Sequence, residues 1–140
     1  MSSLLRISEA ASLALHTASF LAARGEALAT TGEIARAFGV SQAHLSKVLQ
    51  RLVGAGIIKS VRGPHGGFRL APTGREATLL DVYQAIDGPL QAGEYLLGNF
   101  ACGGKCILGD LIASVNRRVA RRLSKTKVSA AGAAGKRRNG

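Results

Sequence analysis

Aromatic residues are scarce in this chain of 140 residues: they make up 4% of it, and tryptophan is absent. A core must therefore be built from aliphatic side chains, since 46% of the residues are hydrophobic. No apolar run approaches the roughly 20 residues of a membrane-spanning helix, so we expect no membrane partner. The N-terminus shows no apolar block followed by a small-residue cleavage site, which favours a cytoplasmic location.

Residues that carry catalytic chemistry are also few. The two cysteines, Cys102 and Cys106, are too few for a disulfide framework. The three histidines are scattered along the chain. No metalloprotease helix motif, phosphate-binding loop or nucleophile elbow occurs. We therefore expect no enzymatic activity.

Charge is abundant but unevenly distributed. The chain has 19 Lys and Arg against 8 Asp and Glu, a net charge of +11. Residues 41–75 contain six basic and no acidic side chains, and residues 117–140 contain nine basic and no acidic ones. The segment between them, residues 76–116, has five acidic side chains and one basic. Two basic zones around an acidic middle indicate a polyanionic partner.

The first half of the chain has the pattern of a helix-turn-helix. Helical spacing of apolar residues predicts a first helix over residues 4–23. Thr30 and Glu33 form a capping-box pattern at the start of a second helix, which should end at Gly39. Ser41 is expected to cap a third helix of about a dozen residues. Two short helices joined by a glycine-containing turn are typical of this motif.

A hairpin and further helices are expected next. Residues 57–61 and 67–70 are β-prone, and the segment between them is dense in turn formers. A hairpin directly after a helix-turn-helix is a wing, with Phe68 expected as a core residue beneath it. Thr78 and Asp81 repeat the capping pattern and predict another helix. The fold class is therefore mostly α with a small β-hairpin wing.

The C-terminal part should contain a long helix that begins near Cys106. Apolar residues at helical spacing form a seam along it: Leu108, Leu111, Ile112, Val115, Val119 and Leu123. Residues 128–140 are rich in Ala, Gly, Lys and Arg, and we expect them to be a disordered basic tail.

The third helix has a surface suited to DNA. Its apolar residues at i, i+3, i+4 and i+7 must face the core. The opposite surface offers short polar groups for base edges and a cation for phosphate or guanine. An ordinary polar surface without a partner is the alternative, and the adjoining wing favours DNA. The predicted contact residues here are Ser41, Gln42, Ala43, His44, Ser46, Lys47 and Arg51.

The wing has complementary chemistry. Arg62 and His65 suit a minor groove, whose negative potential attracts cations. Arg69 and Arg75 suit phosphates, which supply affinity without sequence information. The predicted wing contacts are Arg62, Gly63, Pro64, His65, Gly66 and Arg69.

Residues 30–75 closely resemble the Rrf-two family of bacterial winged helix-turn-helix repressors, the group that includes IscR, NsrR and CymR. The most specific part is VRGPHGGFRL at 61–70, and the resemblance continues through TLLDVYQAIDG and CILGDLI. It implies a homodimeric transcriptional repressor on double-stranded operator DNA. Together with the residue patterns, it divides the chain into four segments: a winged helix-turn-helix domain (1–88), an effector or sensor loop (89–105), a dimerisation helix (106–127) and the basic tail (128–140).

The sensor segment departs from its relatives. Iron–sulfur members of the family are similar in having three cysteines before the dimerisation helix, whereas this chain has two. By family standards the ligand set for a [4Fe–4S] cluster is therefore incomplete, and with only two cysteines we expect either a [2Fe–2S] cluster or no cluster. His16 occupies a position where one relative has a histidine ligand from the other subunit; an ordinary packing or surface histidine is the alternative.

Three alternatives remain for Cys102 and Cys106 at this point: ligation of a cluster or metal such as zinc, a reversible dithiol switch, or inert thiols. Two other functions also remain. One is a non-specific, architectural DNA-binding protein dominated by its basic tail. The other is a metal or cluster delivery protein.

Overall fold

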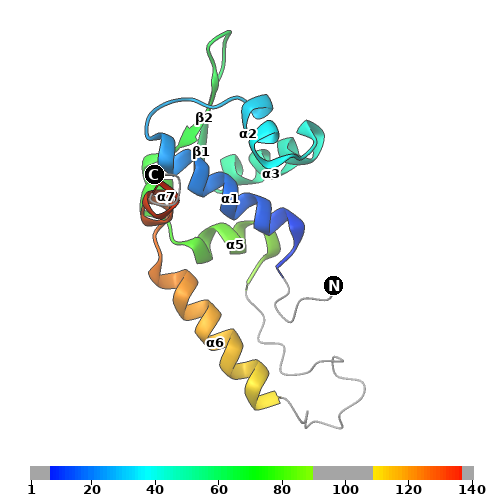
Figure 1. The fold of residues 1–140 in the computed structure, drawn as a ribbon, viewed down its shortest axis with the longest axis vertical. Helices are drawn as coiled ribbons and strands as arrows, with labels where there is room; N and C mark the ends of the chain where they lie inside the picture. Colours follow the sequence, from blue (N-terminus) through cyan, green and yellow to red (C-terminus); the bar gives the residue numbers. More distant parts are fainter. Residues whose placement is uncertain (1–6, 90–108, 137–140) are drawn as a thin grey trace.

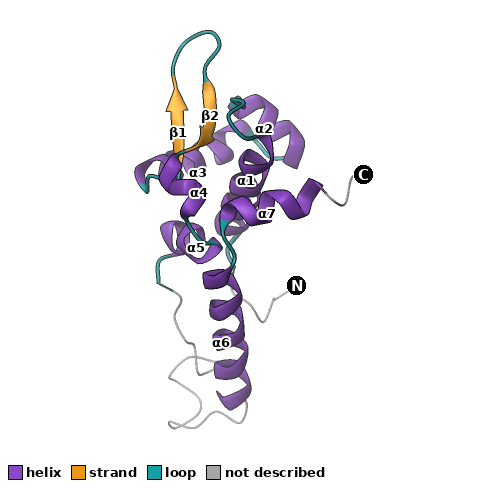
Figure 2. Ribbon diagram, turned by 90° about the vertical axis from the view of Figure 1, so that its left-hand side faces the viewer, coloured by secondary structure: helices purple, strands orange, loops and turns teal. Residues whose placement is uncertain are grey.

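The computed structural model describes residues 7–89 and 109–136, and Figure 1 shows their arrangement. A helical head carries a two-stranded hairpin at one end and a long helix at the other (Figures 1 and 2). The elements in chain order are α1 (Glu9–Arg24), α2 (Thr31–Phe38), α3 (Gln42–Gly54), β1 (Ile58–Val61), β2 (Gly67–Leu70), α4 (Pro72–Glu76), α5 (Leu79–Asp87), α6 (Gly109–Lys125) and α7 (Val128–Lys136). The predicted fold class, mostly α with a β-hairpin wing, is confirmed. No helix in these described ranges is long and apolar enough to cross a membrane.

Helix α1 is the central helix of the head, and it starts later than predicted. Its N-cap is Ser8, whose hydroxyl accepts a hydrogen bond from Ala11 N at 3.0 Å. Ser8 also donates its backbone N–H to the carboxylate of Asp87 at 3.2 Å, so the cap is tied to the end of α5. The predicted start at residue 4 is therefore wrong, because Ser8 is held in an extended conformation by these two contacts. Residues 1–6 lie outside the described part.

The helix-turn-helix follows the predicted capping signals. Glu33 N donates to the Thr30 hydroxyl at 3.1 Å, and Thr30 N donates to the Glu33 carboxylate at 3.2 Å. These reciprocal bonds satisfy backbone donors that the first turn of α2 leaves free. Helix α2 ends at Phe38, and its C-cap Gly39 has the left-handed φ of 64° that glycine adopts at little cost. Ser41 then caps α3 through a bond from His44 N at 3.2 Å.

The core-facing stripe of α3 is confirmed. Leu45, Val48, Leu49 and Leu52 are all buried, as their spacing predicts. They pack in one hydrophobic cluster with residues of α1, α2 and α5. Because this stripe holds α3 against the head, the opposite surface of the helix is directed to solvent.

The wing is an antiparallel hairpin that is fixed at its base. Strand β1 pairs with β2 in a register that sets Lys59 opposite Arg69 and Val61 opposite Gly67. Phe68 is half-buried against the core, as predicted, and its backbone exchanges two hydrogen bonds with Ala29, at 2.8 and 3.0 Å. A side chain at Gly67 would lie only 2.8 Å from the Ala29 carbonyl oxygen, so this approach requires glycine.

The C-terminal part returns to the head. After α6, Leu79 N donates to Thr126 O and Val128 N donates to Ala77 O, both at 2.9 Å. Lys127 also pairs with Glu76 at 2.7 Å, and this hydrogen bond and its charge hold the pKa of the Glu76 carboxyl below its usual value. These contacts fasten the α6–α7 connection to the start of α5.

The prediction of a disordered tail is wrong for residues 128–136, which form α7 and lie against α1. Val128 is fully buried, and Gly132 is buried against Ala22 and Ala23 of α1. A composition of small residues resembles a low-complexity tail, but it also allows two helix backbones to approach closely. The structure therefore makes this segment part of the head.

Candidate nucleic-acid interface

The solvent-facing surface of α3 carries most of the residues predicted to contact base edges. Gln42, Ala43, His44 and Lys47 are exposed, and Ser46 is half-buried. They lie at the N-terminal end of the helix, where a recognition helix meets the major groove. The Ser41 hydroxyl accepts the capping bond from His44 N. Its predicted DNA contact would therefore have to coexist with that bond.

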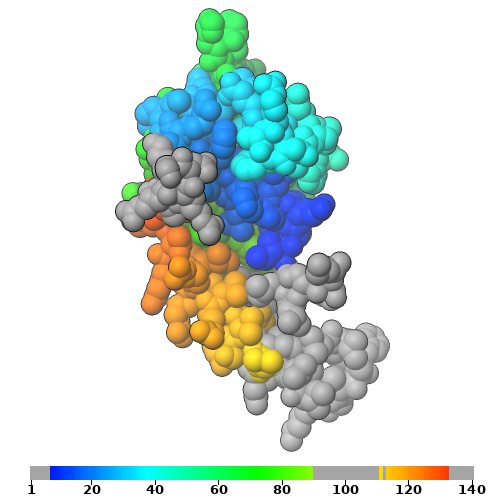
Figure 3. Space-filling model, in the orientation of Figure 1, coloured from blue at the N-terminus to red at the C-terminus, as the bar shows by residue number. Residues whose placement is uncertain are grey.

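The tip of the wing presents the second predicted group. Arg62, Gly63, Pro64 and His65 are exposed, and Gly66 is half-buried. The turn is closed by Gly66 N donating to Gly63 O at 3.0 Å, and Gly63 has a φ of 114° that favours glycine. In the space-filling view the tip projects clear of the head (Figure 3). This shape leaves the backbone of the tip open to a sugar–phosphate chain.

Helix α3 and the wing are neighbours in the head, because α3 contacts β1 directly. Lys47, Lys59 and Arg62 are exposed on these elements, and none pairs with an acid in the described part of the chain. A helix surface of hydrogen-bonding groups beside unpaired cations is the combination that DNA recognition requires.

Three other predicted cations have protein partners. Arg51 donates from its guanidinium to the Ile86 carbonyl of α5 at 3.3 Å. Arg69 lies 3.4 Å from the Glu26 carboxylate, and Arg75 hydrogen-bonds to the same carboxylate. Glu26, the partner of Arg69 and Arg75, was not among the residues predicted from the sequence. No local signal could have revealed it, because Glu26 precedes Arg75 by 49 residues.

His16 lies exposed on α1. Its Nδ1 is 2.7 Å from the Ser12 carbonyl oxygen, and its ring meets the edge of Phe38 with centroids 6.0 Å apart. A hydrogen bond from Nδ1 to a carbonyl leaves Nε2 with its lone pair available, as in many metal-binding histidines. Cys102 and Cys106, and with them most of the predicted 89–105 loop, lie outside the described residues. Within the described ranges, no group of three or more His, Cys, Asp or Glu side chains is placed to hold a metal ion.

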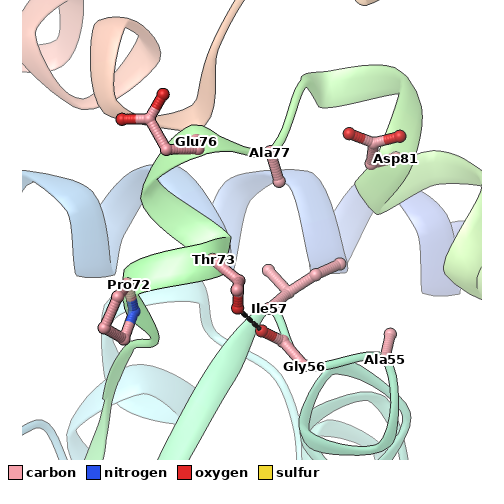
Figure 4. A pocket seen from close by; sticks show the side chains of 8 residues that line it. All are labelled: Ala55, Gly56, Ile57, Pro72, Thr73, Glu76, Ala77 and Asp81. Carbon is pink, nitrogen blue, oxygen red and sulfur yellow. Dashed lines mark hydrogen bonds between the residues drawn. The ribbon is translucent and has the colours of Figure 1, made fainter.

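An open depression of about 700 Å³ lies between the end of α3, α4 and the start of α5. Thr73 donates its hydroxyl to the Gly56 carbonyl at 2.7 Å on its wall (Figure 4). Its lining is formed by Ala55, Gly56, Ile57, Pro72, Thr73, Glu76, Ala77 and Asp81. None of these residues belongs to the predicted DNA-contacting set.

A helix-turn-helix with an adjoining two-stranded wing defines the class of winged-helix DNA-binding proteins. Residues 7–131 match the Rrf2 family model, which is described as an iron-dependent transcriptional regulator. The chain therefore belongs to the Rrf2 family of transcriptional regulators, which are not enzymes.

Curated relatives match part of this chain. Protein aau3 of Rhizobium meliloti is 39% identical over 90 residues, which cover 64% of this chain and 58% of that protein. The transcriptional regulator NsrR of Geobacillus kaustophilus is 34% identical over 76 residues, 54% of this chain and 50% of that protein. The matches thus span between half and three fifths of these relatives.

Solved structures extend the similarity to nearly the whole fold. CymR of B. subtilis, described as its global cysteine regulator, superposes with a TM-score of 0.74 at 23% identity, covering 92% of this chain and 97% of CymR. IscR of T. potens has a TM-score of 0.66 at 24% identity, covering 90% of this chain and 85% of IscR. At these identities the likeness establishes the fold.

Proposed function

We propose that this Rrf2-family regulator is a homodimeric repressor that binds a pseudo-palindromic operator in double-stranded DNA. The observation that carries the proposal is the exposed polar surface of α3 next to strand β1 of a wing whose tip exposes Arg62. The helix would enter the major groove, and Arg62 and His65 would lie over the adjacent minor groove. Soluble regulators of this kind act on chromosomal DNA, so a cytoplasmic location is part of the proposal.

The homodimer is supported by the surface of α6. This 17-residue helix is roughly 25 Å long and extends away from the head (Figures 1 and 2). Leu111 is 59% exposed, and Val115, Val119 and Leu123 are half-buried along the same seam. An exposed apolar seam beside charged residues is typical of a helix that pairs with a second copy.

A footprint on DNA tests the operator proposal. Sites selected from a random duplex pool should share a pseudo-palindrome with half-sites about one helical turn apart, and the protein should protect both halves. Size measurement in solution should give a dimer. Uniform protection that falls steeply with salt and shows no preferred site would instead support the non-specific, architectural alternative.

We further propose that Cys102 and Cys106 form the sensor of this regulator. Thiolates are the ligands of iron–sulfur clusters and are also the groups that oxidants modify. The two thiols and His16 supply three donor groups per chain, whereas a cluster is held by about four protein ligands. A [2Fe–2S] cluster therefore requires a further donor, whereas a dithiol switch requires none.

The Cys102→Ala, Cys106→Ala double variant should bind the operator with an affinity that no longer responds to oxidant, nitric oxide or chelator. The parent should change its affinity by about 1–3 kcal/mol, the usual size of such coupling. Operator titrations with each treatment provide the measurement. His16→Ala separates the chemistries, because it should abolish a visible absorbance of bound iron but leave a dithiol response intact. A double variant that responds as the parent does would rule out the cysteines as the sensor.

A further inference from the structure

Glu26 is placed to control two arginines at the base of the wing. It lies in the connection between α1 and α2, outside the basic zone of residues 41–75. One carboxylate oxygen is 3.4 Å from Arg69 of β2, and the other hydrogen-bonds to Arg75 of α4. Among the described residues, it is the one acid that pairs with two cations.

The exposure of this cluster argues against a role in stability. The Glu26 side chain is 74% exposed, and those of Arg69 and Arg75 are 34% and 37% exposed. Ion pairs this open to water contribute little to the free energy of unfolding. The base of the wing is instead held by the two hydrogen bonds between Phe68 and Ala29. What Glu26 changes is the availability of two guanidinium groups.

Arg69 lies within reach of a DNA backbone that contacts the wing, and Arg75 meets Arg69 at the same Glu26 carboxylate. Arg69 is two register positions from the Val61–Gly67 pair that closes the hairpin, about 7 Å along the strand. A guanidinium on its flexible stem covers such a distance. Without Glu26, Arg69 and Arg75 would add two cations next to Lys59 and Arg62, with no acid among residues 41–75 to offset them.

We propose that Glu26 is a specificity-determining residue: by pairing with Arg69 and Arg75, it withholds two phosphate contacts that would strengthen binding to any DNA sequence. This rests on the proposed operator binding. In a specific complex the base contacts fix the position of the protein on the duplex. The freed arginines then reach phosphates only if that position brings phosphates close to them. In a non-specific complex the protein can shift along the DNA until every cation contacts a phosphate. Freed arginines therefore favour non-specific DNA.

The test is Glu26→Gln, which keeps the shape of the side chain and removes its charge. Affinity is measured over a salt series for the selected operator and for a duplex of unrelated sequence. On the unrelated duplex, the salt slope should steepen by about 0.9 for each arginine that gains a phosphate. The corresponding gain in affinity at the lowest salt should exceed the gain on the operator, so that the ratio between the two duplexes falls several-fold.

Two controls isolate the cause. Glu9→Gln changes the net charge equally at the other end of α1, roughly 24 Å away along a helix of 16 residues, and should leave the slope unchanged. Adding Arg69→Ala and Arg75→Ala to Glu26→Gln should return the slope to that of the parent. Thermal unfolding should show that Glu26→Gln is as stable as the parent.

Different results contradict the role of Glu26 and the proposed operator binding. A parent that shows no preference for any operator refutes the proposed function. A parent that prefers its operator, with a Glu26→Gln variant of unchanged slope on the unrelated duplex, refutes the role of Glu26 alone. Equal gains on both duplexes also refute it, because Glu26 would then set overall affinity and not selectivity.

Discussion

Gly132→Val is expected to lower the free energy of unfolding by about 1–3 kcal/mol, the usual cost of forcing extra atoms into a packed interface. A Cβ at this position would lie 2.6 Å from the Cβ of Ala22 and 2.8 Å from the backbone N of Ala23. Backbone atoms of α1 cannot move aside cheaply, so α7 must shift away from the head. Intrinsic helix propensity acts the other way, since valine is a better helix former than glycine. A loss of stability would therefore come from disturbed packing between α7 and α1.

Chemical denaturation at one fixed protein concentration provides the measurement, because the proposed dimerisation would make apparent stability depend on concentration. The matched control is Ala130→Val, an exposed position in the same helix, which should cost no more than about 0.5 kcal/mol. Equal losses in the two variants, or no loss at Gly132, would show that α7 does not pack on α1 in solution.

This packing changes how the basic C-terminus must be studied. A truncation before Val128 would remove a fully buried residue and the helix that covers α1. Weaker DNA binding by that variant would then reflect damage to the head and not the loss of terminal charges. Removing residues 137–140 alone takes away Arg137 and Arg138 and leaves α7 in place. Only the shorter truncation measures a contribution of the terminal charges to phosphate binding.

The parts of the fold that could be predicted from the sequence are those set by local interactions. The capping boxes at Thr30 and Thr78 and the left-handed Gly39 depend on residues within three or four positions of one another. Helix α7 could not be predicted in this way. Its stability comes from close approach to α1, more than a hundred positions earlier in the chain, and its own composition is that of a flexible segment.

The same difference between local and tertiary interactions decides which parts of the candidate site could be predicted. The solvent-facing surface of α3 follows from the burial of its apolar stripe, so periodicity alone located Gln42 and Lys47. Periodicity cannot say which cation has a partner. Arg51 lies in the same helix as Lys47, yet it donates to Ile86 of α5, and Arg69 meets an acid from the α1–α2 connection. Such pairings depend on tertiary structure.

Lys47→Ala and Arg62→Ala are each expected to weaken operator binding by about 1–3 kcal/mol, because each would remove a proposed charged contact to a groove or its phosphates. The two residues lie on separate elements, α3 and the wing tip, and the losses in the double variant should therefore add approximately. The ratio of operator affinity to the affinity for unrelated DNA will show which kind of contact Lys47 and Arg62 each make. Loss of a cation that binds only phosphate weakens all sequences equally, whereas loss of a groove contact lowers the ratio of operator to unrelated DNA.

Arg51→Ala is the control for this pair, since it removes the same charge from α3 at a side chain already bound to the Ile86 carbonyl. It should change operator affinity less than Lys47→Ala does, and its main effect should be on the contact between α3 and α5. Titrations of operator and unrelated duplexes at one salt concentration distinguish these effects. If Lys47→Ala and Arg62→Ala both bind the operator as tightly as the parent, the DNA-binding surface is not the one formed by α3 and the wing tip.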